Sequence, residues 1–209
     1  MRAVAHLSEK DDTRSQLISA ARDLYLESGP LDFSLREVAR RVGVSAPAVY
    51  RHFEGKDDLL AAACTQGFLV FSSYLVRALA EATPRARLLS TGDQYRRFAL
   101  ENPTDYRFIF MTSPLATGAS GPKGPKPGAD SGLPQDSTFR LLVDRVKECI
   151  EARVLGKGNP DEMAIFIWAH VHGLVSLRLS GKLDAVGSDD AFADFYRASV
   201  AKLLKGLAP

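Results

Sequence analysis

The sequence has little cysteine and no apolar N-terminal segment, and each shortage excludes a class of protein. Only 2 cysteines occur in 209 residues, too few for the disulfide framework of a small secreted domain. Cys64 and Cys149 lie in apolar helical patterns, so we expect them to be small buried side chains in a reducing compartment. Residues 1–15 are polar and lack the apolar core of a signal peptide. These features favour a cytoplasmic protein.

Long apolar runs and a large excess of one charge are lacking as well. The longest apolar run, residues 164–179 (AIFIWAHVHGLVSLRL), contains two histidines and an arginine and is too short and too polar for a clean membrane span. We therefore expect no membrane partner. The formal net charge is only +2, so a nucleic-acid partner has to be argued from local clusters of charge and not from the total.

No known arrangement of catalytic or metal-binding residues is present. A nucleophile, a base and an orienting group do not occur at a recognisable spacing, and no glycine-rich phosphate loop precedes a helix. His170 and His172 are two residues apart on a predicted helix, so they point to nearly opposite faces and cannot chelate one metal as histidines four apart can. We predict no enzyme activity, no metal and no cofactor. A helical enzyme stays an alternative that would need an ionisable cluster around a C-terminal cavity.

What the sequence does contain is helical periodicity. Apolar residues recur at spacings of three and four, with no strand pattern and no internal repeat, so the predicted fold class is all-α. We expect helices over 12–28, 34–43, a short segment from 45, 56–82, 84–111 with an interruption near 102–103, 137–155, 160–181 and 189–206. Residues 113–135 (SPLATGASGPKGPKPGADSGLPQ) are rich in glycine and proline and are predicted to form a flexible linker.

Local signals divide residues 34–53 into two helices joined by a tight turn. Ser34 and Glu37 have the spacing of a capping box. Gly43 suits the left-handed residue that ends a helix. Ser45 can cap the next helix, and Pro47 falls in its first turn, where a missing N–H costs little. This is the layout of a helix-turn-helix, whose second helix enters the major groove of DNA.

The residue types of this segment suit contact with DNA. Small residues at the tip of the second helix let its backbone approach the bases, and cations and a phenol lie on either side of the tip. Arg36, Arg40 and Arg41 add positive charge from the preceding helix, although a merely solvated helix face is the better reading for at least one of Arg40 and Arg41. Lys56 begins the following helix, where its charge and free backbone N–H groups can bind one phosphate.

Residues 12–60 resemble the DNA-binding domain of the tetracycline-repressor (TetR) family. The resemblance is carried by SLREVARRVGVSAPAVYRHFEGKDDLL at residues 34–60, above all by the Gly-Val-Ser turn and Tyr50 to Phe53. It implies that Phe53 packs the second helix onto the others. It also implies that the phosphate contacts are Ser34, Tyr50, His52 and Lys56, and that the residues facing bases are Arg36, Ala46, Pro47 and Ala48. Ser45 and Arg51 complete the set of predicted DNA-binding residues, which is Ser34, Arg36, Ser45, Ala46, Pro47, Ala48, Tyr50, Arg51, His52 and Lys56.

The rest of the chain resembles the family more weakly. The stretches ENPTDYRFIF (101–110) and WAHVHGLVSL (168–177) are similar to the C-terminal domain of one branch, which has a Trp, a His and a Gly near Trp168, His172 and Gly173. The resemblance implies a DNA-binding domain over residues 1–57 and a domain for ligand binding and dimerisation over residues 58–209.

The aromatic residues of the C-terminal part are more numerous than a small helical bundle needs. Each taken alone is best explained as core, but as a group they predict a mostly apolar pocket with a few polar tips. The predicted pocket residues are Phe68, Phe71, Tyr95, Phe98, Tyr106, Phe110, Phe139, Trp168 and His172.

Residues 160–181 are apolar on nearly all sides, so one face of this helix needs a partner. Ala169 and Gly173 are four apart and would allow two helices to approach closely, and the last helix carries a similar apolar pattern. A four-helix interface between two copies is the simplest arrangement. The predicted interface residues are Ile165, Ala169, Gly173, Phe192, Tyr196 and Val200.

These features together predict a ligand-responsive transcriptional regulator. We expect a homodimeric repressor that binds an inverted repeat in double-stranded DNA and is released by a small, mostly apolar molecule. The alternative is a DNA-binding regulator of the same fold without a small-molecule effector, and a filled pocket would favour it.

Overall fold

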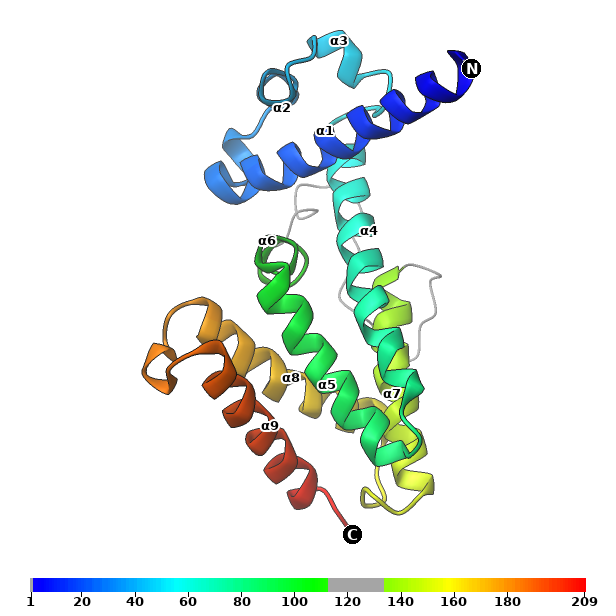
Figure 1. The fold of residues 1–209 in the computed structure, drawn as a ribbon, viewed down its shortest axis with the longest axis vertical. Coiled ribbons are helices and arrows are strands. Elements are labelled where there is room, and N and C mark those ends of the chain that lie inside the picture. Colours follow the sequence, from blue (N-terminus) through cyan, green and yellow to red (C-terminus); the bar gives the residue numbers. More distant parts are fainter. Residues whose placement is uncertain (1, 113–133) are drawn as a thin grey trace. The chain divides into compact units, whose positions relative to one another are not determined.

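The computed structural model of the chain is all-α, as predicted (Figure 1). It describes residues 2–112 and 134–209, and the side chains of 12–29, 33–112 and 137–209. No strand occurs in these described ranges. The elements are α1 (Arg2–Asp32), α2 (Leu35–Val42), α3 (Ala46–Val49), α4 (Lys56–Leu75), η1 (Val76–Ala80), α5 (Pro84–Glu101), α6 (Pro103–Tyr106), η2 (Arg107–Met111), α7 (Pro134–Glu151), α8 (Pro160–Leu179), η3 (Asp184–Val186) and α9 (Asp189–Gly206).

Most helices agree with the sequence prediction, and their ends differ for local reasons. The first helix begins at Arg2, earlier than predicted, and Gly29 breaks its regular geometry at φ 81° and ψ 176°. The predicted helix over 56–82 is α-helical to Leu75 and then tightens into the 3-10 helix η1. The predicted interruption near 102–103 is confirmed, because α5 ends at Glu101. Residues 113–133 of the predicted linker lie outside the described part of the chain, and Pro134 already begins α7.

The chain divides into two compact units. The described residues of the first, called the N-terminal unit below, are 2–68 and 104–112, and those of the second, the C-terminal unit, are 69–103 and 134–209. The division falls within α4, whereas the predicted domain boundary lies at residue 57.

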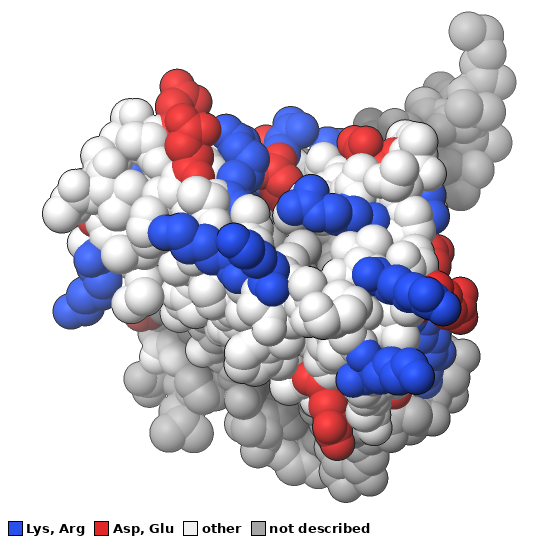
Figure 2. All heavy atoms as spheres, turned by 90° about the horizontal axis from the view of Figure 1, so that it is seen from below, with Lys and Arg blue, Asp and Glu red and all other residues white. Residues whose placement is uncertain are grey.

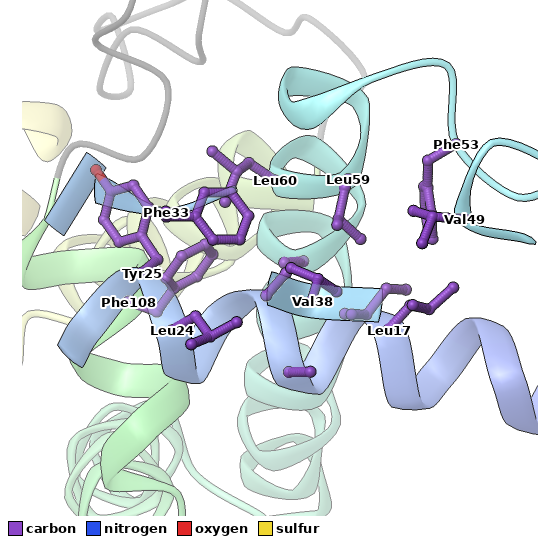
Figure 3. Packing of buried hydrophobic residues seen from close by; sticks show 14 of the residues in the cluster. Leu17, Leu24, Tyr25, Phe33, Val38, Val49, Phe53, Leu59, Leu60 and Phe108 are labelled. Carbon is purple, nitrogen blue, oxygen red and sulfur yellow. The ribbon is translucent and has the colours of Figure 1, made fainter. Parts of the chain in front are cut away.

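The core of the N-terminal unit holds α2 and α3 against α1 and α4 (Figure 3). Leu17 and Leu24 come from α1, Val38 from α2, and Leu59 from α4, and all four are buried. Val49 and Phe53 point into the same cluster from α3 and the turn that follows it. The predicted packing role of Phe53 is therefore confirmed.

The segment that follows α5 also belongs to the N-terminal unit. Phe108 is buried in the same cluster, where its ring meets Tyr25 edge-on at 5.4 Å between ring centroids. The Arg22 guanidinium on α1 forms an ion pair with Asp105 on α6. The close approach of η2 to α4 requires a glycine, because a Cβ atom at Gly67 would lie 2.7 Å from Cγ2 of Ile109.

In the C-terminal unit, α5 packs against α7, α8 and α9, and α8 also packs against α7 and α9 (Figure 1). The Tyr196 hydroxyl on α9 donates a hydrogen bond of 2.7 Å to the Gly92 carbonyl on α5. Segment Lys56–Ala80 is long and apolar enough to pass a test for a membrane span by length and composition alone. Core helices of soluble proteins pass the same test, and α4 buries Leu59, Leu60 and Phe68.

Candidate DNA interface and ligand site

The caps expected from the sequence fix the geometry of the helix-turn-helix. The Glu37 backbone N–H donates to Ser34 Oγ at 3.3 Å, and the Ser34 backbone N–H donates to Glu37 Oε2 at 3.2 Å, so the capping box is present. Gly43 is left-handed, at φ 78° and ψ 24°. Ser45 occupies the N-cap position of α3 but makes no side-chain capping bond, and Pro47 lies in the first turn.

Most predicted DNA-binding residues lie on the outside of the N-terminal unit. Tyr50 is 61% exposed. The exposed set also includes Ser34, Arg36, Ser45, Pro47 and Arg51, and the half-buried set consists of Ala46, His52 and Lys56. Ala48 is different: it is only 4% exposed, so its methyl group packs in the interior and is not presented to a base.

The cations of this unit differ in how they are held. Arg41 donates two hydrogen bonds, of 2.7 and 2.8 Å, to the Glu27 carboxylate, and these bonds lower the pKa of Glu27. Arg41 is therefore part of a surface ion pair. This fits the interpretation that at least one of Arg40 and Arg41 belongs to a solvated helix face and not to the DNA contacts. Lys56 is half-buried, and its Nζ lies 4.8 Å from the centroid of the Phe33 ring, a cation–π contact.

The positive charge relevant to DNA is local and not a property of the whole surface. On the face shown in Figure 2, Lys and Arg side chains lie among Asp and Glu side chains, so that face carries charge of both signs. Because the formal net charge is only +2, a site for phosphates depends on particular residues such as Arg36, Arg51 and Lys56.

A polar group inside the aromatic part of the C-terminal unit is the candidate ligand site. The Tyr95 hydroxyl lies 2.9 Å from His172 Nδ1, and Trp168 Nε1 donates to the Tyr95 oxygen at 3.4 Å. An indole N–H can only donate, so the Tyr95 oxygen accepts from Trp168, and the Tyr95 hydroxyl can donate its own hydrogen bond to His172 Nδ1. Burial lowers the pKa of His172, which favours the neutral imidazole that accepts this bond.

The nine predicted pocket residues form two groups, one in each unit. In the C-terminal unit, Phe71 lies 5.5 Å from Tyr95 and 5.0 Å from Phe98 between ring centroids, and Phe139 lies 6.3 Å from Trp168. In the N-terminal unit, the Phe110 ring contacts Phe68 at 5.7 Å and Tyr106 at 5.4 Å. Tyr106 and Phe98 are completely buried, as core residues are.

His170 and His172 face different helices, as their spacing predicts. His170 Nε2 lies 3.1 Å from Ser199 Oγ on α9, whereas His172 lies against Tyr95 on α5. No group of three or more His, Cys, Asp or Glu side chains that could hold a metal ion occurs among the residues that the structure describes.

The predicted dimer-interface residues separate into an outer and an inner set. On α8, Ile165 and Ala169 are exposed, and a Cβ atom at Gly173 would meet nothing within 4 Å. In contrast, Phe192, Tyr196 and Val200 are buried inside their own chain, so placing them at an interface was wrong. The apolar stripe of α9 packs on α5 and α8.

Three exposed apolar residues of α8 and α9 belong to the apolar patterns of the predicted helices but not to the predicted interface set. Phe166 is 54% exposed, and Leu177 and Phe195 are also exposed. Phe166 and Leu177 share a face with Ala169 and Gly173 at helical spacing, so the same spacing argument extends to them. An exposed apolar face of this kind is the type of surface that contacts between macromolecules use.

Two family models match the chain. Residues 17–63 match the model of bacterial regulatory proteins of the tetR family, and residues 88–203 match the tetracyclin repressor-like C-terminal domain. Among relatives, the HTH-type transcriptional activator FasR of Mycolicibacterium smegmatis is 31% identical over 48% of this chain and 47% of its own length. The class A tetracycline repressor from transposon 1721 of Escherichia coli is 30% identical over 61% of this chain and 53% of its own length. The chain thus spans about half the length of these curated relatives.

Solved structures of other proteins can be superposed on nearly the whole chain. A protein of unknown function from Rhodococcus sp. RHA1 is 28% identical with a TM-score of 0.72, and the match covers 94% of this chain and 96% of that one. A TetR family transcription regulator from Marinobacter aquaeolei VT8 is 18% identical with a TM-score of 0.74, covering 100% and 99%, which shows the fold alone. The matched families and relatives are transcription regulators and not enzymes. The C-terminal model alone spans more than half of the chain, so the protein belongs to the TetR family of DNA-binding transcription regulators.

Proposed function

We propose that this protein is a cytoplasmic, homodimeric repressor that binds an inverted repeat in DNA and leaves it when a small, mostly apolar molecule binds. DNA binding itself follows from the family. The main support for the proposed DNA interface is the exposure of Ser45, Pro47 and Tyr50 at and around α3. The turn at Gly43 and the buried ring of Phe53 fix the position of this segment. Because the side chains at this tip are small, the backbone can approach base edges closely, while the surrounding cations bind phosphates.

Base recognition then falls to a small number of side chains. Arg36 and Arg51 are exposed and can donate two hydrogen bonds to a guanine. Ala46 and Pro47 offer apolar contact to thymine methyl groups. Ala48 drops out of this proposed set, because its methyl group is buried. Ser34, Tyr50, His52 and Lys56 remain the proposed phosphate contacts.

The effector site is proposed around Tyr95, Trp168 and His172. Their hydrogen bonds lie among the rings of Phe71 and Phe139, so the surroundings suit an apolar molecule with one or two polar atoms. The effector must bind the DNA-competent and DNA-incompetent states of the dimer unequally, since equal affinity shifts nothing.

The dimer is proposed to form through the outer face of α8 with Phe195 of α9. This face supplies Ile165, Phe166, Ala169, Gly173 and Leu177. Two copies related by a twofold axis would bury these side chains against each other and present two recognition helices to two half-sites.

One observation favours the alternative of a regulator without an effector. The Tyr95 hydroxyl, Trp168 Nε1 and His172 Nδ1 already bond one another, so these three atoms do not require a ligand to be satisfied. In that case the three residues would serve only to fix the core of the C-terminal unit.

Selection from a pool of randomised duplexes tests the DNA part of the proposal. We expect the purified protein to enrich an inverted repeat and a reporter gene placed behind that repeat to be repressed. Enrichment of a single unrepeated half-site would contradict the dimeric mode, and activation of the reporter would contradict repression. A screen of apolar metabolites for release of the selected duplex then tests the effector, with Tyr95→Phe as the variant expected to lose part of the response.

A further inference from the structure

Two cations of the N-terminal unit lie over buried aromatic rings. One is Lys56 above Phe33, as described. The other is Arg14 on α1, whose Cζ atom lies 5.0 Å from the centroid of the Phe53 ring. Both rings are almost completely buried in the same core, so core packing holds each ring in place beneath the charge that contacts it. Lys56 belongs to the predicted phosphate contacts, and Arg14 does not.

We propose that Arg14 is a further DNA-binding residue, a phosphate contact on α1 that extends the interface beyond the helix-turn-helix. Arg14 precedes residues 17–63, the stretch matched by the DNA-binding family model. The inference rests on the DNA binding proposed above and adds a contact from a different helix.

The position of Phe53 places the Arg14 charge beside the recognition segment. Phe53 closes the turn after α3, where its backbone N–H donates to the Val49 carbonyl at 3.0 Å. The ring of the adjacent His52, a predicted phosphate contact, lies 6.4 Å from the Phe53 ring. A guanidinium above Phe53 is therefore next to a surface already expected to meet the DNA backbone.

Arg14 also differs from other arginines of this unit in its side-chain partners. Arg22 pairs with Asp105, and Arg41 pairs with Glu27. Arg14 is exposed, and among the residues that the structure describes its side chain makes no ion pair and no hydrogen bond.

The chemistry of stacking leaves Arg14 able to bind a phosphate. A guanidinium packs on a ring through its flat face, whereas its N–H donors point outward in its own plane. The donors can therefore hold two oxygens of one phosphate while the stack persists. The ring also restricts the side chain before DNA arrives, which lowers the entropy lost on binding. A phosphate is the expected target because the residue lies outside the recognition helix.

Salt dependence separates a phosphate contact from a packing role. Arg14→Met keeps an aliphatic chain over Phe53 without the charge, and Arg14→Lys keeps the charge without the flat stack. Affinity is measured over a series of salt concentrations, using a mixed-sequence duplex about three helical turns long as the probe. The plot of log affinity against log salt should lose about 0.9 of slope for each Arg14 phosphate contact removed in Arg14→Met, and keep its slope in Arg14→Lys.

Arg85→Met is the matched control, because Arg85 is exposed on α5 in the C-terminal unit. It should leave the slope unchanged. An unchanged slope in Arg14→Met, with or without a lower melting temperature, would show that Arg14 only packs on Phe53. If Lys56→Ala lowers the slope in the same assay, only the inference on Arg14 fails. If the wild-type protein binds neither this duplex nor any inverted repeat enriched by selection, the proposed function fails with it.

Chemical footprinting of the wild-type protein gives an answer that does not depend on how the variants fold. An arginine-specific dicarbonyl reagent modifies exposed guanidinium groups, and mass spectrometry locates the adducts. Saturating duplex should protect Arg14 and leave Arg85 reactive. Equal modification of Arg14 with and without duplex would overturn the assignment.

Discussion

At the scale of single residues, the helix-turn-helix separates into side chains that hold the fold and side chains that face outward. Ala48, Val49 and Phe53 belong to the core, although Ala48 belongs to the set that the family resemblance assigns to bases. On a helix as short as α3, neighbouring residues can differ in role, one packing in the core and the next facing outward, because successive side chains are turned by about 100°. Sequence pattern alone identifies the segment but not the direction of each side chain.

Lys56→Ala tests the proposed phosphate role of a single cation. Binding to operator and to mixed-sequence duplex should weaken similarly, because a phosphate carries no sequence information. The salt slope should fall by about 0.9 for each Lys56 phosphate contact removed. Tyr50→Phe, which removes one hydroxyl and no charge, should keep the slope. A loss confined to the operator would show that Lys56 reads bases instead.

His172 should make stability depend on pH. Burial holds the pKa of folded His172 below its ordinary value of 6.5, so the unfolded chain binds a proton more readily than the folded one. The folded state is then destabilised as the pH falls below about 6.5, whereas well above this pH His172 does not reduce the free energy of unfolding. The expected observation is a melting temperature that falls more steeply from pH 7.5 to pH 5.5 in the wild-type protein than in His172→Asn.

The asparagine variant serves as the control because its amide can replace the Nδ1 contact with Tyr95 and does not titrate in this range. Parallel pH profiles of the two proteins would mean that His172 does not determine the acid sensitivity.

At the scale of elements, the turn signals predicted more than the periodicity did. Ser34, Gly43 and Pro47 each occupy the expected position, because caps and prolines act through the local backbone and need no tertiary information. Helix ends without such signals were placed less well. The predicted start at residue 12 misses the first turns of α1, and the predicted end at residue 155 overruns α7, which stops at Glu151. Arg153 follows with a left-handed φ of 57°, a role for which glycine is the usual signal.

Gly43→Ala should destabilise the DNA-binding unit through the backbone alone. The left-handed conformation at φ 78° disfavours a side chain by about 1–2 kcal/mol, and the new methyl would meet no atom within 4 Å. The denaturation midpoint should fall with an unchanged m-value. The matched variant Gly206→Ala also enters open space, but in a helix, so it should be neutral or slightly stabilising. Equal effects would contradict the backbone explanation.

At the scale of the whole molecule, periodicity does not distinguish packing within a chain from packing between chains. The stripe of α9 that includes Phe192 and Tyr196 was assigned to a dimer interface, but it is used inside the C-terminal unit. The aromatic residues assigned to one pocket fall into two units for a related reason, since helical spacing identifies a buried face but not its neighbour. Burial in the folded chain supplies the missing information, and it leaves α8 with an outer apolar face.

Gly173→Leu tests the α8 interface with opposite expectations for the monomer and the dimer. Within one chain a side chain at position 173 enters open space, and leucine favours a helix over glycine by up to about 1 kcal/mol, so the monomer should not be weakened. Between two chains the same leucine occurs twice at the point of closest approach and should force the helices apart. Sedimentation at low micromolar concentration should therefore show monomers, and the operator should be bound weakly.

The control for this prediction is an equally exposed apolar residue elsewhere in the same unit. Leu79 on η1 is 48% exposed and lies outside α8 and α9, so Leu79→Arg should leave the dimer intact, whereas Phe166→Arg should dissociate it. Both changes are at the surface of the monomer, where the stability cost is usually within about 0.5 kcal/mol. If Phe166→Arg and Gly173→Leu both remain dimeric while Leu79→Arg dissociates, the partner subunit binds at η1 and not at α8. The spacing of the two recognition helices would then have to be derived from that other interface.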